Sequence, residues 1–151
     1  MKNIKGNKKG FTLVELLAVI VVLAILVLLA MPAVLNMMQR AQRSAFVTEA
    51  NNIARIGEMA YSDQILQGNL ERCFSLERLN TLGYMNKAIA TNMYGSVQIN
   101  TPSAGPATVQ VWFSNGAFYF EGLERSSLTE AGITNGAPAN PTRFDRCGST
   151  S

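Results

Sequence analysis

Residues 8–35 read KKGFTLVELLAVIVVLAILVLLAMPAVL, and this stretch decides the fold class. Its part from Leu16 to Leu35 is a run of twenty residues without a single charge. A helix needs about 20 apolar residues to cross the hydrocarbon core of a bilayer. The stretch therefore predicts an N-terminal helix that is long enough to span a membrane.

The residues before this helix indicate how it is oriented. The first ten residues, MKNIKGNKKG, contain four lysines and no acidic residue. Positively charged segments next to a membrane helix stay on the cytoplasmic side. We therefore expect the N-terminus inside the cell and the body of the chain on the other side of the membrane.

Two common kinds of apolar N-terminal segment explain this stretch less well. A secretory signal peptide has a shorter apolar region, of about 7–15 residues, and then a cleavage site with small residues. Here the run continues as MPAVLNMMQRAQRS over residues 31–44. A plain signal anchor explains the lysines but not Glu15, because a carboxylate at the centre of a membrane helix costs about 2.5–3.5 kcal/mol on insertion scales and less near the end.

This combination resembles the N-terminal segment of type IV pilins and pseudopilins. The matching residues are Gly10, Phe11, the Thr-Leu-Val of residues 12–14, Glu15, and Pro32 near the end of the apolar run. The resemblance implies that residues 1–10 are a leader peptide, and their short length is similar to the type IVa pattern. A prepilin peptidase would cleave between Gly10 and Phe11 and methylate the new amine of Phe11.

The resemblance also implies how the mature chain is used. An assembly platform and a cytoplasmic ATPase would move subunits from the membrane into a helical homopolymer, with residues 11–35 as its apolar core. Phe11, Glu15 and Pro32 are then the residues expected to act in assembly. We expect the carboxylate of Glu15 to pair with the Phe11 amine of a neighbouring subunit, because unpaired charges in an apolar core are costly. One departure from the family is Ala24, which stands where a glycine is often found.

After the apolar run, the pattern remains helical. Apolar residues recur at helical spacing between Phe46 and Ala60, opposite a polar face, and Gln67-Gly68-Asn69 is a stop signal. One helix from Phe11 to Leu66 is therefore expected, with its second half packed on the head. A further short helix is predicted over residues 75–84, with Ser75 as N-cap and Gly83 at its end.

The remaining part of the chain changes to a period of two. Alternating apolar residues predict three antiparallel strands, around residues 97–99, 109–113 and 118–120. Asn115-Gly116 predicts a two-residue hairpin turn between the last two. The expected fold class is therefore α+β, a long N-terminal helix against a small antiparallel sheet, with residues 36–151 as a globular head.

Three residues of these strands, Trp112, Tyr119 and Glu121, fall on the face opposite to the one that covers the helix. This pattern leaves two interpretations open. The aromatic pair is either a contact patch for another subunit or a ligand, or it packs under the C-terminal segment.

The composition excludes several classes of function. The chain has no histidine, which removes Ser-His-Asp and Cys-His catalysis and every His-ligated metal site. No phosphate loop or nucleophile elbow is present, and the acids of the C-terminal half are dispersed, although some secretion pseudopilins hold calcium in this region. We therefore expect no enzyme, no cofactor and no metal.

The charge balance is consistent with this. Thirteen Lys and Arg against ten Asp and Glu give +3, but four lysines lie in the first ten residues, and the remainder is 9 − 10 = −1. The head is therefore not expected to bind nucleic acid.

The only two cysteines, Cys73 and Cys147, can form one disulfide, which an oxidising compartment would permit. We expect them to be bonded, so that the polar C-terminal tail is held near the end of the long helix. This resembles the disulfide-bounded C-terminal region of pilins, although here the enclosed segment also contains the sheet.

Two function classes follow from the resemblance, and a third from the residues alone. The first is a structural subunit of a type IV pilus, used for adhesion, motility or aggregation. It would begin as a single-pass precursor in the bacterial cytoplasmic membrane and end in an extracellular filament. The second is a pseudopilin of a type II secretion or DNA-uptake system. The third is a stand-alone membrane-anchored binding domain, which would not be cleaved after Gly10.

Overall fold

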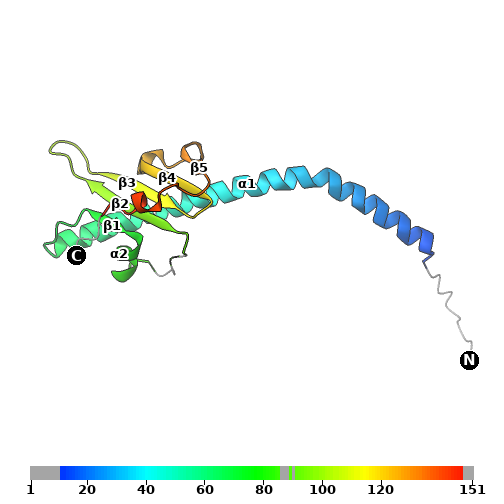
Figure 1. Ribbon diagram of the computed structural model, residues 1–151, viewed down its shortest axis with the longest axis horizontal. Helices are drawn as coiled ribbons and strands as arrows, with labels where there is room; N and C mark the ends of the chain where they lie inside the picture. The colour runs from blue at the N-terminus through cyan, green and yellow to red at the C-terminus, as the bar shows by residue number, and fades with distance from the viewer. Residues whose placement is uncertain (1–10, 86–88, 90, 148–151) are drawn as a thin grey trace, which may run out of the picture. The chain divides into compact units, whose positions relative to one another are not determined.

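A computed structural model describes residues 11–85, 89 and 91–147. The chain divides into two compact units, one that ends at Arg40 and one that begins at Ala41. A single long helix, α1 (Leu13–Leu66), runs through both, and a small sheet belongs to the second (Figure 1). The expected α+β layout is therefore confirmed.

Helix α1 begins two residues later than expected and ends at the predicted stop signal. Gly68 adopts a φ of 82°, and the amide of Asn69 donates to the carbonyl of Gln64 at 2.8 Å. A left-handed glycine just after the last helical residue is a common way to satisfy the free carbonyls of a helix end. The helix is continuous across Ala24 and Pro32.

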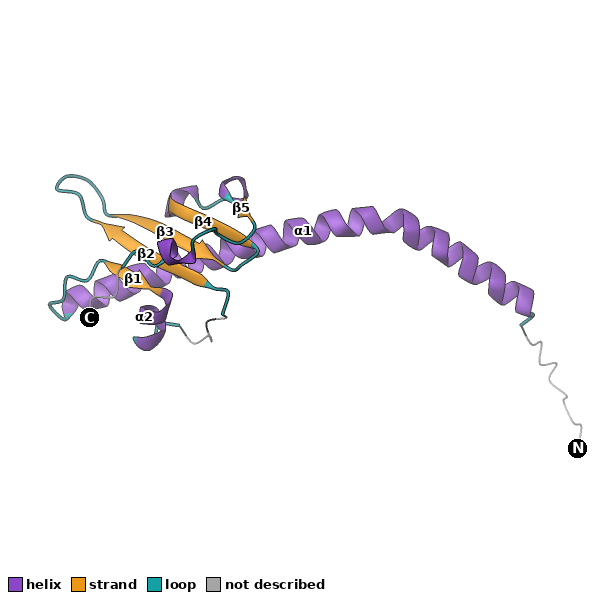
Figure 2. Cartoon of the chain, in the orientation of Figure 1, coloured by secondary structure: helices purple, strands orange, loops and turns teal. Residues whose placement is uncertain are grey.

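Burial within α1 is confined to its second half. The buried residues recur at helical spacing, as the sequence predicted for most of them: Phe46, Ala50, Ile53, Ala54, Gly57, Ala60 and Gln64. They face the sheet, which lies along this part of the helix (Figure 2). The first half of α1 contributes no buried residue.

The sheet has five antiparallel strands in sequential order, where three were expected. The strands are β1 (Cys73–Ser75), β2 (Tyr94–Asn100), β3 (Thr108–Ser114), β4 (Phe118–Glu124) and β5 (Thr134–Asn135). The three predicted strands form the middle of the sheet. The two that the prediction missed are the edges, and each has three residues or fewer, too few to show a period of two.

The turn between β3 and β4 differs from the prediction. Ser114 pairs with Tyr119, so four residues lie between the last paired positions, and Gly116 has a φ of 86°. The side-chain oxygen of Asn115 accepts hydrogen bonds from the amides of Ala117 at 3.0 Å and Phe118 at 2.9 Å. The two-residue turn was therefore wrong, because the asparagine side chain stabilises a longer loop than its Asn-Gly dipeptide suggests.

The centre of the core is an aromatic cluster between α1 and the sheet. The ring of Phe46 stacks on Phe113 with centroids 5.1 Å apart and on Phe120 at 5.0 Å. Near this cluster Gly57 lets the helix approach β2, since a Cβ at this position would lie only 2.5 Å from a methyl carbon of Val97.

Helix α2 (Leu76–Thr81) is shorter than the predicted helix over residues 75–84. Its expected caps are present. The hydroxyl of Ser75 accepts a hydrogen bond from the amide of Arg78 at 3.1 Å, and Gly83 has a φ of 82°. Leu79 is buried with Ala60 and Phe74 in a second, smaller cluster.

The last part of the C-terminal segment covers the outer face of the sheet, whereas Leu128 and Ile133 before it belong to the main core. The whole segment contains three short 3-10 helices, η1 (Arg125–Ser127), η2 (Glu130–Gly132) and η3 (Pro141–Phe144). Phe144 meets Tyr119 edge to face at 5.7 Å, and the guanidinium of Arg146 lies 5.4 Å above the ring of Trp112. Trp112 is only 8% exposed. Of the two interpretations of this aromatic pair, packing under the C-terminal segment is the one confirmed.

Candidate assembly site

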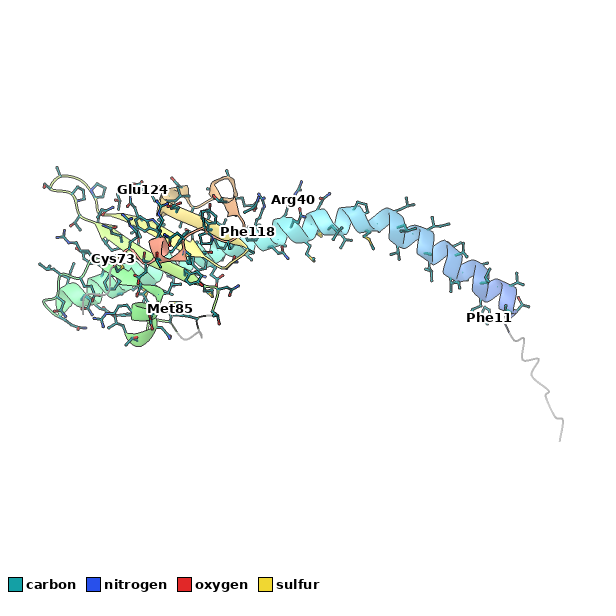
Figure 3. The ribbon with its side chains drawn as sticks, in the orientation of Figure 1. Phe11, Arg40, Cys73, Met85, Phe118 and Glu124 are labelled. Atoms are coloured by element: carbon teal, nitrogen blue, oxygen red, sulfur yellow. A yellow bond between two sulfur atoms is a disulfide. The ribbon has the colours of Figure 1, made fainter. Side chains whose placement is uncertain are left out.

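The first half of α1 exposes an apolar surface on all of its sides. Its large apolar side chains between Leu13 and Met38 are exposed by 49% to 80%, and they point outward around the helix (Figure 3). Burying one such side chain contributes about 1.5–3 kcal/mol. This segment is long and apolar enough to cross a membrane. We expect lipid or other protein to cover this surface, because contact between apolar side chains and water is unfavourable.

Glu15 is the one acidic residue in this surface, and it is bonded to its own helix. Its Oε2 atom accepts hydrogen bonds from the backbone amide of Thr12 at 2.9 Å and from the Thr12 hydroxyl, also at 2.9 Å. In return, the hydroxyl of Thr12 accepts from the amide of Glu15 at 3.3 Å. The carbonyl of Thr12 accepts the first bond of the helix, from Leu16 at 3.2 Å.

These bonds make a reciprocal capping box. Thr12 is the N-cap residue, and Glu15 occupies the third position of the helix. Thr12 is an additional functional residue beside the predicted ones, and its signature is present in the sequence: a threonine followed three residues later by glutamate, before an apolar run.

Phe11 lies just before the box and is 88% exposed. Within the described part of the chain, the hydrogen bonds of Glu15 go to Thr12 and none goes to Phe11. The expected pairing of Glu15 with a Phe11 amine joins two subunits and stays a prediction. Gly10, the other residue of the expected cleavage site, lies outside the described residues.

Pro32 lies inside the continuous helix rather than at a break. Because proline has no N–H group, the carbonyl four residues earlier lacks its usual donor. Ala24 is helical as well, in agreement with the high helix propensity of alanine. The role expected for Pro32 in assembly is not tested by its position.

The disulfide between Cys73 and Cys147 closes the head. Their Cα atoms are 5.1 Å apart, and the two residues are 74 positions apart in the sequence. The bond joins β1 to the end of the C-terminal segment, which also bonds to the sheet through Ser96. The Ser96 hydroxyl donates to the carbonyl of Phe144 at 2.7 Å and accepts from the amide of Arg146 at 3.2 Å.

Polar contacts fix other parts of the head. Arg78 forms an ion pair with Glu71 at 3.1 Å, and the carboxylate raises the pKa of Arg78 through this hydrogen bond. Arg125 of η1 forms an ion pair with Glu58 of α1. Arg43 donates to the side-chain oxygen of Asn135 in β5 at 2.9 Å.

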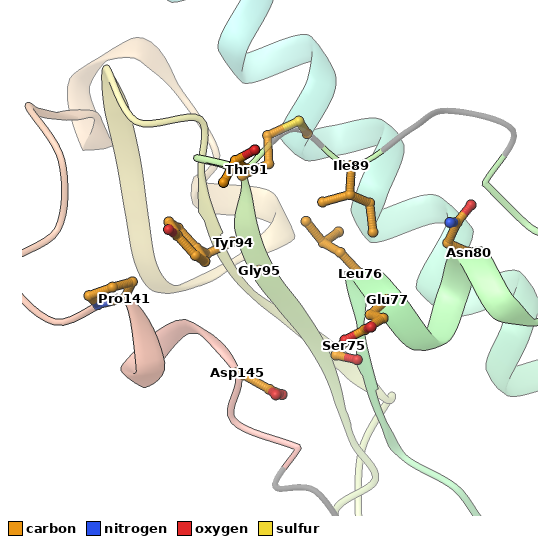
Figure 4. Close-up of a pocket in the computed structure, with 11 residues that line it drawn as sticks. Ser75, Leu76, Glu77, Asn80, Ile89, Thr91, Tyr94, Gly95, Pro141 and Asp145 are labelled. Carbon is orange, nitrogen blue, oxygen red and sulfur yellow. The ribbon is translucent and has the colours of Figure 1, made fainter.

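A groove of about 500 Å³ lies between α2, the start of β2 and the C-terminal segment. Tyr94 and Pro141 stand on one side of it, and Leu76 and Ile89 on the other (Figure 4). Its carboxylates are Glu77 and Asp145. Among the residues that the structure describes, no group of three or more His, Cys, Asp or Glu could hold a metal ion.

The comparisons with known proteins concern the N-terminal part of the chain. Residues 5–31 match a family model described as the prokaryotic N-terminal methylation motif. No curated protein and no solved structure matches the chain. The match includes the leader residues from Lys5, the expected cleavage site, the capping box and the apolar run up to Met31.

Proposed function

The chain carries the type IV prepilin signature and has a pilin-like layout, and from this premise we propose that it is a structural subunit of a type IV pilus. The signature implies processing by a prepilin peptidase and assembly into a pilus-type structure. The observation that carries the proposal is the exposed apolar half of α1, which overlaps this motif and continues beyond it. The role is structural rather than catalytic.

In the precursor, the apolar segment is a membrane anchor. The motif and the apolar helix fit a membrane-anchored precursor. We propose that its N-terminus faces the cytoplasm, because the first ten residues hold four lysines. Cleavage after Gly10 then leaves Phe11 as a methylated N-terminus, and the anchor is retained in the mature chain.

In the filament, the same residues form the core. About twenty exposed aliphatic side chains would lose their contact with lipid on extraction, and packing against the helices of neighbouring subunits would replace it. Apolar surfaces alone slide past each other at little cost. The pairing of Glu15 with the Phe11 amine of a neighbour would fix the axial register, because each buried charge then has a partner.

A pseudopilin of a secretion or DNA-uptake system has the same N-terminal signature. We favour the pilus subunit because the described part of the head contains no group of three or more His, Cys, Asp or Glu that could hold a metal ion, and the resemblance associates calcium with some secretion pseudopilins. Adhesion, twitching motility and aggregation are the activities that we propose for the extracellular filament.

The experiment that tests this function compares Glu15→Val with the wild type in the native host. We expect Glu15→Val to insert and to be cleaved normally, but to enter sheared filaments poorly while monomer accumulates in the membrane. Glu15→Gln keeps the shape of the side chain and removes its charge, so it shows which of the two matters for assembly. Leu17→Val is the matched control, since it changes apolar bulk in the same segment and should assemble like the wild type.

Two measurements decide the outcome. Electron microscopy and protein staining of the sheared fraction give the filament yield, and intact mass gives the N-terminus. A wild-type mass that retains residues 1–10 would make the chain a plain signal anchor. Filaments of Glu15→Val at wild-type abundance would contradict the charge-pairing account of assembly.

A further inference from the structure

In the capping box, the two carboxylate oxygens of Glu15 differ in their hydrogen bonds. Both hydrogen bonds from Thr12 go to Oε2, each at 2.9 Å. Within the described residues, Oε1 makes no hydrogen bond. A carboxylate oxygen can accept more than one donor, so Oε1 keeps its full acceptor capacity. The side chain is thus held at one oxygen and open at the other.

The box is independent of the leader peptide. It involves only the backbone and side chains of Thr12 and Glu15. Cleavage before Phe11 would leave the amide of Thr12 as an ordinary peptide N–H, still able to donate. The precursor and the mature subunit can therefore hold the same carboxylate geometry, and the charge of Glu15 remains satisfied within one chain before any neighbour arrives.

The hydroxyl of Thr12 does two things at once. It donates to Oε2 of Glu15 and accepts from the Glu15 amide. Burying a charged group without hydrogen bonds costs free energy, and each hydrogen-bond donor offsets part of that cost. A residue that only caps the helix would supply the acceptor but not the donor, so the two roles of Thr12 can be separated by substitution.

We propose that Thr12 is the positioning residue for Glu15. It holds the carboxylate against the helix end while the subunit is in the membrane, and it presents Oε1 to the cationic group of a neighbouring copy during assembly. This inference rests on the proposed function, because it assumes that Glu15 meets a cation of another subunit.

A series of three substitutions tests the role. Thr12→Ser retains a hydroxyl that can donate and accept. Thr12→Gly loses the hydroxyl but retains most of the capping free energy, because glycine at an N-cap costs only a few tenths of a kcal/mol relative to threonine. Thr12→Val preserves the shape of the side chain and removes both hydrogen bonds of the hydroxyl. Each variant is expressed as the full precursor in the native host.

The expected results separate positioning from simple capping. We expect Thr12→Ser to yield sheared filaments within about twofold of the wild type. We expect Thr12→Gly and Thr12→Val to be cleaved to the same extent as the wild type, but to lose filament yield at least tenfold. In a Glu15→Gln background, Thr12→Val should change the yield much less, since its effect acts through the carboxylate.

Three other results would overturn the inference. Wild-type filament yield from Thr12→Gly and Thr12→Val would show that the hydroxyl has no role in assembly, and the proposed function would stand. A wild-type filament yield from Thr12→Gly but not from Thr12→Val would show that Thr12 acts only as a helix cap. Uncleaved Thr12→Gly and Thr12→Val precursors would place Thr12 in recognition by the peptidase. Absence of the wild-type chain from sheared filaments would instead contradict the proposed function itself.

Discussion

At the scale of single residues, Tyr84 connects the segment after α2 to the long helix. Its hydroxyl donates to Oδ2 of Asp63 at 2.5 Å. The carboxylate holds the hydroxyl proton through this hydrogen bond and thereby raises the pKa of Tyr84 above its usual value of about 10. A smaller part of the increase comes from desolvation and from the negative charge of Asp63.

This raised pKa makes a prediction about stability at high pH. A tyrosine with a higher pKa in the folded state stabilises the protein below the pKa of the unfolded chain, and this contribution is lost as pH rises through the folded value. The advantage of the wild type over Tyr84→Phe should therefore be constant between about pH 7 and pH 9, and it should fall above about pH 10. Urea unfolding of the mature chain in detergent micelles across this range measures it.

The control for this prediction is Tyr94→Phe, which removes an exposed tyrosine hydroxyl from the same head. It shows how much of the difference comes from the loss of a tyrosine hydroxyl as such. A wild-type advantage over Tyr84→Phe that grows above pH 10 would contradict the role of the Asp63 bond.

Single residues also show how far a sequence can identify the candidate site. Glu15 can be identified from the sequence because a carboxylate costs free energy in a membrane helix, and an ordinary membrane anchor does not need one. Thr12 is as visible, since its spacing from Glu15 is that of a capping box, but it was overlooked beside the stronger charge signal. The backbone amide and the hydroxyl of Thr12 both donate to the same oxygen of Glu15. This could not be predicted from the sequence, because side-chain torsions decide it.

At the scale of elements, α1 is one helix with two kinds of surface. Periodic burial between Phe46 and Ala60 could be predicted because one face has to meet the sheet. The middle strands could be predicted from alternation, whereas β1 and β5 could not. Their pairing depends on the disulfide next to β1 and on the course of the C-terminal segment, neither of which has a local signal.

The β3–β4 pair contains a second feature without a local signal. The register shifts between Val111 and Phe113, so that two residues of β4 lie opposite Trp112. One of these is Gly122, with a φ of 66°, and a Cβ at this position would lie 3.0 Å from the Trp112 ring. The bulge thus depends on a contact across the sheet that alternation alone does not show.

The close approach of α1 to β2 gives a prediction at this scale. Gly57→Ala places a methyl group 2.5 Å from a methyl carbon of Val97, so one of the two has to move. Overpacking of this kind costs about 1–3 kcal/mol. The gain in helix propensity, about 1 kcal/mol, offsets only part of it. We expect a net loss of stability in urea unfolding of the mature chain, followed by Trp112 fluorescence.

A double-mutant cycle with Val97→Ala provides the internal control. The two substitutions should be less harmful together than the sum of their separate effects, because the new methyl group occupies space that valine leaves. Asn52→Ala changes an exposed position of the same helix and should raise stability slightly. A Gly57→Ala chain as stable as Asn52→Ala would mean that the helix and β2 separate at little cost.

At the scale of the whole molecule, the disulfide determines how the C-terminal segment is held. Residues 125–147 contain short 3-10 helices, the two-residue β5 and loops, and Phe144 and Arg146 cover Tyr119 and Trp112 on the outer face of the sheet. Such a segment has few hydrogen bonds of regular structure. The end of this segment is held by the buried ring of Phe144, by the Ser96 hydrogen bonds and by the bond between Cys73 and Cys147.

Removal of this bond tests that dependence. Closing a loop of 74 residues is worth about 4 kcal/mol by the chain-entropy relation. We expect the double variant Cys73→Ser/Cys147→Ser to lose up to this amount and to become sensitive to protease from about Ser126 onward. Limited proteolysis with mass spectrometry maps the cuts. The wild type treated with reductant is the control and should show the same cuts, whereas labelled free thiols in untreated filaments would count against the bond.

The position of the disulfide also decides how the protein responds to mechanical force. A chain pulled between Phe11 and its C-terminal end transmits tension along α1 to Cys73, and from there directly across the sulfur bridge to Cys147. All five strands lie in the bypassed segment, which would otherwise release about 260 Å of contour length on extension. On the N-terminal side of Cys73, the helix and the short connection after it are the parts that can lengthen. Under traction the sheet and the C-terminal segment are therefore shielded, whereas α1 and its packing on the sheet bear the load, and a reducing solution would remove that protection at once.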